Sequence, residues 1–262
     1  MADPEDKTTS KVEDWLENEG YRLEYVTHKA LNDVGLTTVM SSYVESENGI
    51  QREIDVHASL MPDFAIAKLT LVRLMCECKY SVDKPWILLQ SGVPANLWCD
   101  WLSLPKSPDL HEASADIEQY GRLLYGSWHF AREQYFAHNL VQAFRGKNRD
   151  IAFDSLKKIA NAAWDYVETP HRRGANAYLL AIPSIIVDAP LYWACFDHKK
   201  KQFVAKKVPY GRLLWGGCRN DTLVDIVQAS AINEYANTVR KTFDILLKVI
   251  VFLQNKANLK TP

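Results

Sequence analysis

Two extended runs decide the fold of this chain: IQREIDVHASL (residues 50–60) and VRLMCECKY (residues 72–80). The dipeptide Asn48-Gly49 separates the first of them from an earlier run, TTVMSSYVES (residues 37–46). Asn-Gly favours a type I′ turn, because both central residues of that turn take φ > 0. The pattern therefore predicts a β-hairpin followed by a third strand.

Side chains alternate between the two faces of a strand. Asp55 is therefore expected to share a face with Glu53 and His57, opposite a face formed by Ile54, Val56 and Ala58. On the third strand Glu77 and Lys79 share one face, and Leu74, Cys76 and Cys78 share the other. Adjacent strands lie about 4.8 Å apart, so pairing of the two strands would bring the carboxylates of Asp55 and Glu77 together.

Two converging carboxylates beside a lysine suit the metal-dependent cleavage of phosphodiesters. Mg²⁺ takes one or two carboxylates together with waters and phosphate oxygens, and a lysine can orient water and stabilise the developing charge. Glu-x-Lys alone is also common on solvated strand faces. Here apolar residues flank the pair on a strand that we expect to be internal. Burying these charges without a role would cost free energy, which favours a site.

These residues resemble the PD-(D/E)xK, or restriction-endonuclease-like, nuclease superfamily over about residues 11–86. The resemblance implies a core of one helix, a three-stranded meander, a crossover helix and a further strand. It implies that Asp55, Glu77 and the backbone carbonyl of Cys78 bind Mg²⁺ or Mn²⁺. Lys79 would then position the attacking water. Ile54, rather than proline, precedes Asp55.

Members of this superfamily often add polar residues around the metal site. An acidic residue on the first helix would correspond to Glu13, with Glu17 and Glu19 as alternatives. Glu53 and His57 share the expected strand face of Asp55 and are accessory candidates, although His57 also suits a simple polar strand position. A polar helix residue would correspond to Gln134 or Gln142.

The rest of the pattern predicts an α/β fold with a mixed central sheet, in one nuclease domain over residues 1–262. We expect a first helix from Thr9 or Ser10 to Gly20. Expected strands span about residues 22–28, 36–46, 50–60 and 69–80, with a buried strand at 178–188 and a hairpin at 191–208. Expected helices span about 113–145, 151–167 and 222–256. The core would occupy about 11–86 and 150–215, with a helical elaboration over about 90–149.

The last helix carries an apolar seam with alternating steps of four and three residues. Its members are Ile232, Ala236, Val239, Phe243, Leu246, Ile250 and Leu253. Such a seam can form a homodimer interface or pack on the sheet of its own chain. The sequence leaves both alternatives open.

Bulk properties fit a globular enzyme. Hydrophobic residues make up 47% of the chain and charged residues 24%, which is ordinary for a folded domain. Five cysteines without paired spacing argue against a disulfide framework or a zinc site. The polar start MADPEDKTTSK does not predict a signal peptide. No apolar run reaches the length of a membrane span, so we expect a cytoplasmic protein with no membrane partner.

The net charge of −1 is low for a nucleic-acid enzyme, but basic residues cluster. Candidate phosphate contacts are Arg145, Lys147, Arg149, Arg172, Arg173, Lys199, Lys200 and Lys201. Solvated turns are the alternative for each cluster, above all for the HKKK turn.

We therefore expect a Mg²⁺-dependent DNA endonuclease, of the kind used in restriction or antiviral defence, with a protein partner as one source of specificity. A non-catalytic scaffold subunit with the same fold and an enzyme acting on RNA are the alternatives.

Overall fold

The computed structural model describes residues 4–18, 21–46, 48–60, 69–81, 84–90, 103–113, 135–144, 150–173, 177–216 and 221–260. Its helices are α1 (Pro4–Asn18), α2 (Tyr21–Asp33), α4 (Pro108–Ala113), α6 (Ile151–Arg172) and α7 (Ile232–Lys260), the last preceded by a 3₁₀ turn at Ala229–Ala231. Its strands are β1 (Thr37–Glu45), β2 (Gln51–Leu60), β3 (Leu69–Tyr80), β4 (Trp86–Gln90), β5 (Phe136–Ala137), β6 (Asn139–Gln142), β7 (Ala177–Asp188), β8 (Leu191–Asp197), β9 (Gln202–Lys207), β10 (Tyr210–Gly216) and β11 (Asp221–Gln228).

The fold is α/β with mixed sheets, as the sequence predicts. Within the described residues, seven strands form a central sheet in the order β1-β2-β3-β7-β11-β10-β5. Strands β1, β2 and β3 make the expected antiparallel meander. Strand β3 then pairs in parallel with β7, the apolar run that the sequence predicts as a strand buried on both faces.

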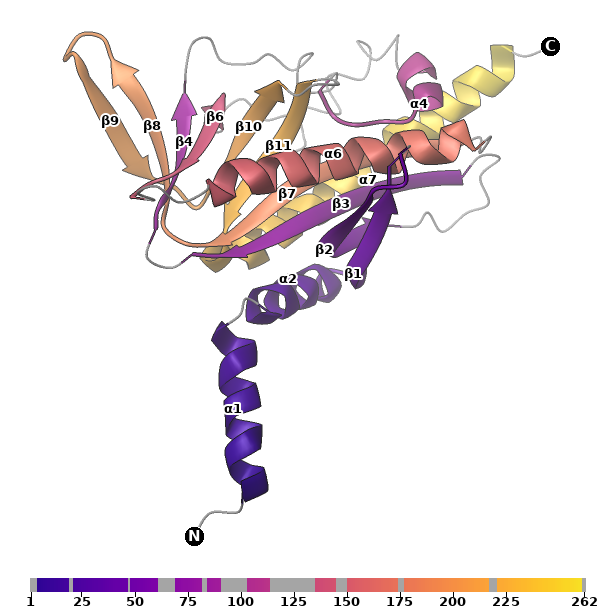
Figure 1. The fold of residues 1–262 in the computed structure, drawn as a ribbon. Helices are drawn as coiled ribbons and strands as arrows, with labels where there is room; N and C mark the ends of the chain where they lie inside the picture. The colour runs from indigo at the N-terminus through magenta and orange to yellow at the C-terminus, as the bar shows by residue number, and fades with distance from the viewer. Residues whose placement is uncertain are drawn as a thin grey trace.

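A second sheet has the strand order β6-β4-β8-β9. Both of its inner strands follow directly from the central sheet, because β4 comes soon after β3 and β8 begins three residues after β7. The backbone N–H of Trp86 at the start of β4 donates to the carbonyl of Pro190, just before β8, at 2.9 Å. The end of the β3–β7 pair therefore leads into the second sheet (Figure 1).

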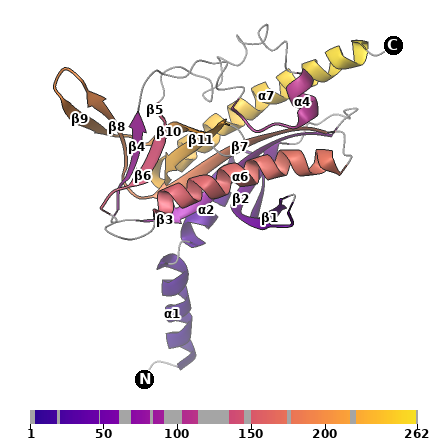
Figure 2. The ribbon, with the colours of Figure 1, turned by 45° about the horizontal axis from the view of Figure 1, so that its top comes forward.

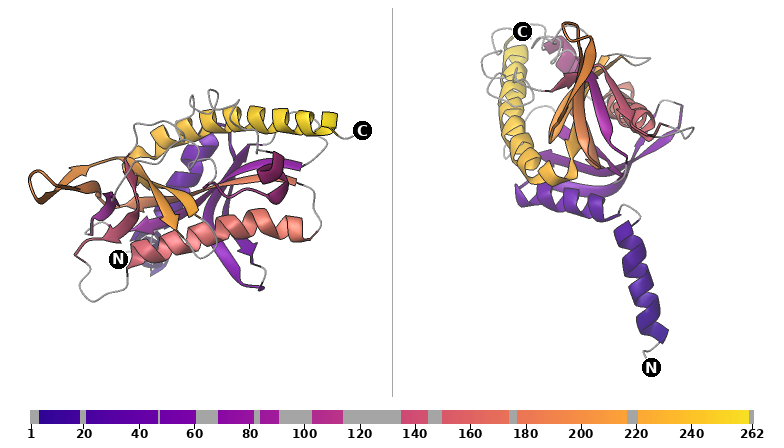
Figure 3. Two further views of the ribbon diagram at one scale, coloured as in Figure 1. Left: turned by 90° about the horizontal axis from the view of Figure 1, so that it is seen from above. Right: turned by 90° about the vertical axis from the view of Figure 1, so that its left-hand side faces the viewer.

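Helices cover both faces of the central sheet. Helix α6 lies on one face, and α2 and α7 lie on the other (Figures 1 and 2). Each face has its own buried core, one beneath α6 and one beneath α2 and α7. Helix α1 packs against α2 and projects away from the sheets (Figure 3). No helix in the described ranges is both long and apolar enough to cross a membrane.

The apolar seam of α7 packs on the sheet of its own chain. All seven members, from Ile232 to Leu253, are buried. Tyr235, on the same side of α7, donates a hydrogen bond to Asp225 of β11 at 2.8 Å and contacts Ser184 of β7 at 2.7 Å. Of the two alternatives for this seam, the structure shows intramolecular packing.

Three predicted elements are wrong. Residues 22–28 form part of α2 rather than a strand, because Leu23, Thr27, Ala30 and Leu31 recur at helical spacing and bury one stripe. The helix expected over 113–145 is absent from residues 135–144, where β5 and β6 pair with β10 and β4; residues 114–134 lie outside the described part. Residues 221–228 form β11 beside β7, although most of them belong to the helix expected over 222–256.

Candidate active site

The candidate site lies where β2 and β3 separate. Their ladder runs from Leu60–Val72 to Val56–Cys76, and the next pair in register would be Asp55 with Glu77. The alternation of β2 breaks here, because Ile54, Asp55 and Val56 are all buried. The expectation that Ile54 shares the face of Val56 is therefore wrong: Ile54 packs beneath α6 and Val56 beneath α2 and α7.

Asp55 and Glu77 are held close together inside the sheet. The backbone N–H of Cys78 donates to Oδ2 of Asp55 at 2.7 Å, which fixes the Asp55 carboxylate against the end of β3. The Glu77 side chain is only 1% exposed. Because β2 and β3 are inner strands, the site lies within the sheet and not at its edge.

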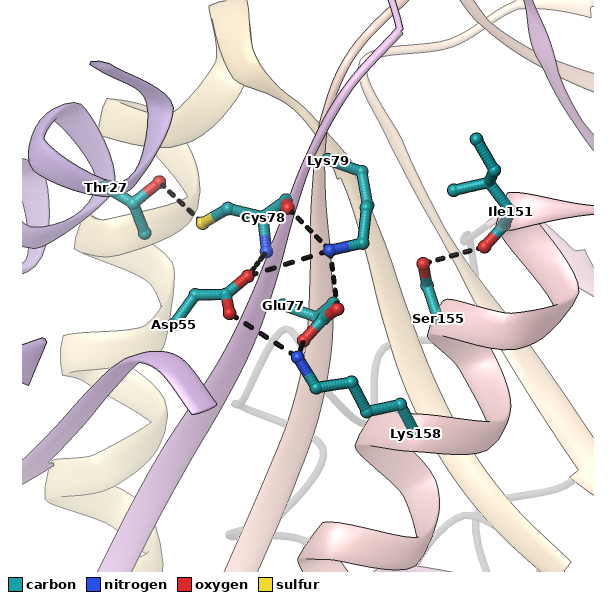
Figure 4. Close-up of polar contacts among 8 residues, drawn as sticks. All are labelled: Thr27, Asp55, Glu77, Cys78, Lys79, Ile151, Ser155 and Lys158. Carbon is teal, nitrogen blue, oxygen red and sulfur yellow. Dashed lines mark hydrogen bonds and ion pairs between the residues drawn. The ribbon is translucent and has the colours of Figure 1, made fainter. Parts of the chain in front are cut away.

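Two lysines neutralise this carboxylate pair (Figure 4). Nζ of Lys79 on β3 lies 2.6 Å from Oε1 of Glu77, 3.9 Å from Oδ2 of Asp55 and 3.1 Å from the carbonyl oxygen of Cys78. Nζ of Lys158 on α6 lies 2.6 Å from Oε2 of Glu77 and 3.6 Å from Oδ1 of Asp55. The predicted residues Asp55, Glu77 and Lys79 thus meet, and they are joined by Lys158, which is not among the predicted site residues.

Burial and the oppositely charged neighbours shift the pKa values of Glu77 and Lys158 in opposite directions. Burial, followed by the charge of Asp55, raises the pKa of Glu77, and the two lysines oppose that shift. Burial alone would lower the pKa of Lys158, but Glu77 and Asp55 outweigh it and raise that pKa. Each lysine therefore stabilises the ionised form of a carboxylate that the interior disfavours.

Glu24 on α2 is a further acidic group near the site. Burial, then the charges of Asp55 and Glu53, raise the pKa of Glu24 to about 7, while Lys79 acts to lower it. Glu24 follows the buried Leu23 on the helix that covers β2 and β3. Glu24 is thus a helix carboxylate whose pKa responds to Asp55, whereas Glu13 lies on α1.

The elements that carry the site are cross-linked. On α2, the hydroxyl of Thr27 lies 3.7 Å from the sulfur of Cys78 (Figure 4). On α6, the buried carboxylate of Asp165 pairs with Nε of Arg52 on β2 at 3.0 Å. These contacts fix both covering helices to the strands that bear the carboxylates.

The candidates on the first helix do not reach the site. Glu13 and Glu17 are exposed on α1, which projects away from the sheet, and Glu17 pairs with Arg22 at 3.4 Å. Glu19 lies outside the described residues. Glu53 is exposed on β2, and its charge adds to burial and to Asp55 in raising the pKa of Glu24.

His57 is a polar strand residue apart from the carboxylates. Its Nδ1 lies 2.7 Å from the hydroxyl of Ser42 on β1, and burial together with the charge of Arg73 lowers its pKa to about 4. Gln142 lies on β6 rather than on a helix, and its amide donates to Ser81 at 2.6 Å. Gln134 is outside the described part of the chain.

The candidate phosphate contacts are only partly described. Arg145, Lys147 and Arg149 lie outside the described residues, and the side chain of Arg172 is not described. Arg173 pairs with Glu45 at 2.7 Å, which links the end of α6 to β1. Lys199, Lys200 and Lys201 form the exposed turn between β8 and β9.

The donor set suits a hard divalent cation. Asp55, Glu77 and the carbonyl of Cys78 offer oxygen atoms, and Mg²⁺ at phosphoryl-transfer sites takes one or two carboxylates and completes its coordination with water and substrate. Among the described residues no group of three or more His, Cys, Asp or Glu side chains is arranged to hold a metal ion. Two carboxylates and one carbonyl nevertheless match the share that a protein contributes to such a site.

Comparisons of the chain with family models, with curated proteins and with solved structures found no match. The function is therefore inferred from the residues of the site and their geometry.

Proposed function

We propose that this protein is a metal-dependent nuclease that hydrolyses nucleic-acid phosphodiester bonds, and that DNA is its substrate. The observation that carries the proposal is the meeting of Asp55, Glu77 and Lys79, with the lysine 2.6 Å from the glutamate. Carboxylates for a cation and an ammonium group for phosphate or water are the parts that this reaction needs. Cleavage within a strand, as in restriction or antiviral defence, is the activity proposed.

The position of each residue suggests its role in the reaction. Asp55, Glu77 and the Cys78 carbonyl would hold Mg²⁺ or Mn²⁺, which when bound polarises the scissile phosphate and acidifies a water. The ammonium group of Lys79 can donate hydrogen bonds to the attacking water and to a phosphate oxygen. Lys158 approaches the carboxylates from α6 and offsets the negative charge that an incoming phosphate adds.

A substrate panel tests the proposal. The wild type, Asp55→Asn and Asp33→Asn are incubated with supercoiled plasmid, linear duplex, single-stranded DNA and RNA in Mg²⁺ or Mn²⁺. Asp33 is the matched control, because it pairs with Lys29 on the exposed end of α2. We expect cleavage of DNA by the wild type and Asp33→Asn, and none by Asp55→Asn. Cleavage confined to RNA would overturn the proposal that DNA is the substrate. Equal cleavage by all three proteins would overturn the assignment of Asp55 to the active site.

One observation favours a second candidate, a non-catalytic scaffold with this fold. Lys79 and Lys158 already neutralise both carboxylates, so the four groups also satisfy one another as a structural ion-pair network. The two candidates differ in metal binding. A nuclease should gain thermal stability from Mg²⁺ or Mn²⁺ and lose that gain in Asp55→Ala, whereas a scaffold should show no gain in either protein.

A further inference from the structure

The β8–β9 hairpin projects from the body at the end opposite the C-terminus (Figure 1). Its register pairs Phe196 with Phe203 and Asp197 with Gln202, and the turn between them is His198–Lys201. All six residues of β9 are exposed. Because β9 is the last strand of its sheet, it buries little and leaves most of its surface open to a partner.

Aromatic rings gather beside the turn. Phe196 and Phe203 lie directly across the hairpin from each other, with their ring centroids 5.3 Å apart in an edge-to-face arrangement. The ring of His198 meets Phe196 in the same way at 5.2 Å. Phe203 is 69% exposed and Phe196 41% exposed, so this pair of touching rings is accessible to a partner.

The hairpin that carries these rings is rich in lysine. The hairpin from Leu191 to Lys207 carries five lysines and one aspartate, whereas the whole chain has a net charge of −1. Asp197 is used within the turn, where its Oδ1 accepts the backbone N–H groups of Lys199 and Lys200. These bonds hold the turn in shape; Nζ of Lys200 lies 3.8 Å from Oδ2 of the same carboxylate, and Lys199, Lys200 and Lys201 are all exposed on the turn that joins the two strands.

The hairpin starts next to the candidate site. Lys79 of β3 pairs in register with Val187 of β7, and β8 begins at Leu191. The seven residues of β8 extend about 20 Å at about 3.3 Å per residue. A nucleic-acid strand seated at Asp55 and Glu77 therefore needs only a few nucleotides to reach the rings.

We propose that the β8–β9 hairpin binds single-stranded nucleic acid, with unpaired bases stacked on Phe203 and Phe196 and phosphates paired with the turn lysines. Resting on the proposed nuclease function, this names the substrate class as nucleic acid with an unpaired segment beside the cleaved bond. Stacking on aromatic side chains within a basic surface is the usual physical basis of single-strand binding, because every base offers a π-face. Paired bases in a duplex keep their faces covered by their neighbours.

Other occupants fit this surface less well. A second copy pairing along β9 would have to place the exposed Lys206 and Lys207 in the shared sheet edge, and lysines on an edge strand oppose such pairing. An anionic membrane would meet the lysines of the turn first, since the phenylalanines lie behind the turn on the strands. Exposed rings on the strands, next to a lysine-rich turn, suit a nucleic-acid strand that lies across the hairpin.

The test measures binding without divalent metal, so that cleavage cannot intervene. Fluorescence anisotropy compares a labelled single strand of about 20 nucleotides, enough to span a typical single-strand site, with its duplex for the wild type, Phe203→Ala, Phe203→Tyr and Phe252→Ala. Tyrosine retains a stacking ring, and Phe252 is an exposed phenylalanine on α7, outside the hairpin. A parallel arm measures cosedimentation with phosphatidylserine vesicles. Thermal melting verifies that each variant is folded.

We expect the wild type to prefer the single strand. Phe203→Ala should weaken single-strand binding by about tenfold, while Phe203→Tyr and Phe252→Ala bind like the wild type. Replacing the three turn lysines with alanine should reduce the slope of log K against log salt concentration by about 0.7 for each phosphate that those lysines neutralise in the wild type. Equal binding by Phe203→Ala and Phe252→Ala, or hairpin-dependent binding to vesicles alone, would overturn the inference. Hairpin-dependent binding without cleavage of any substrate would instead overturn the nuclease proposal.

Discussion

Lys158 approaches Glu77 as closely as Lys79 does, although it comes from a helix almost 80 residues later in the chain. Both ammonium groups lie 2.6 Å from Glu77, one at each carboxylate oxygen. The two cations favour the ionised form of this buried carboxylate, against the burial and the Asp55 charge that raise its pKa.

Replacing Lys158 with alanine should therefore impair both folding stability and activity. The buried Glu77 carboxylate would then pair with one cation instead of two, so we expect a loss of about 1–3 kcal/mol in the free energy of unfolding. Cleavage should slow by roughly 100-fold, the usual cost of removing one group that stabilises transition-state charge. Lys157→Ala is the matched control, because Lys157 is the exposed neighbour on α6. Similar urea curves and cleavage rates for the two variants would contradict this role.

Glu24 should make stability depend on pH. Its pKa is raised from 4.5 to about 7 in the fold, so folding favours the protonated carboxyl. That contribution is complete below about pH 4.5 and is lost as the pH rises through 7. Glu24→Gln mimics the protonated form and should raise Tm over the wild type at about pH 8, with a smaller difference at about pH 5.5, both measured without divalent metal. Glu13→Gln, on the exposed α1, should show no such trend; a pH-independent difference for Glu24→Gln would refute the assignment.

The Glu-x-Lys motif and the expected pairing of β2 with β3 are enough to predict that Asp55, Glu77 and Lys79 meet, although the alternation of β2 breaks at Asp55. Predicting Lys158 requires knowing which face of α6 covers β3. A signal for it is present in the sequence, because Lys158 is in helical register with the buried Ser155, Ala162 and Asp165. That signal acquires meaning only when the helix is placed over the carboxylates, and no local pattern specifies this placement.

At the scale of elements, the errors come from short apolar runs that suit either a strand or a helix. RLEYVTH in α2 alternates well enough to resemble a strand, and TLVDIV in β11 lies directly before a strongly helical stretch. Tertiary neighbours decide both cases. Strand β11 pairs with β7 on one side and β10 on the other. Helix α2 packs on the face of β2 and β3 that it covers. Glu24 is not predicted as a helix carboxylate near the site for the same reason, because it lies in the strand expected over 22–28.

Helix α7 should stabilise the single chain. Leu246 is fully buried in the core that α2 and α7 share. Leu246→Ala should lower the free energy of unfolding by about 2–5 kcal/mol, with an unfolding midpoint that does not change with protein concentration. Lys248→Ala, at an exposed position on the same helix, should leave the midpoint unchanged. A midpoint that rises with protein concentration in the wild type, but not in Leu246→Ala, would instead indicate that the seam joins two copies.

At the scale of the whole molecule, the site lies where one sheet passes into another. The backbone N–H of Ser81, just after β3, donates to Asp188 at the end of β7 at 3.3 Å, and both strands lead on to the second sheet. The central meander is predictable because its partners are adjacent in sequence. The second sheet is not, because its strands come from three distant segments of the chain. In a chain of nearly neutral net charge, the second sheet carries a basic hairpin that starts near the carboxylate–lysine site.

The most direct test of the nuclease proposal is the rate of Mg²⁺-dependent cleavage of a single DNA that carries an unpaired segment. Wild type, Lys79→Ala and Lys157→Ala are compared at equal concentration, after melting curves have shown that each is folded. The proposed site predicts equal rates for the wild type and Lys157→Ala, and a rate at least about 100-fold lower for Lys79→Ala. Equal cleavage by all three proteins, or no cleavage by the wild type, would contradict it.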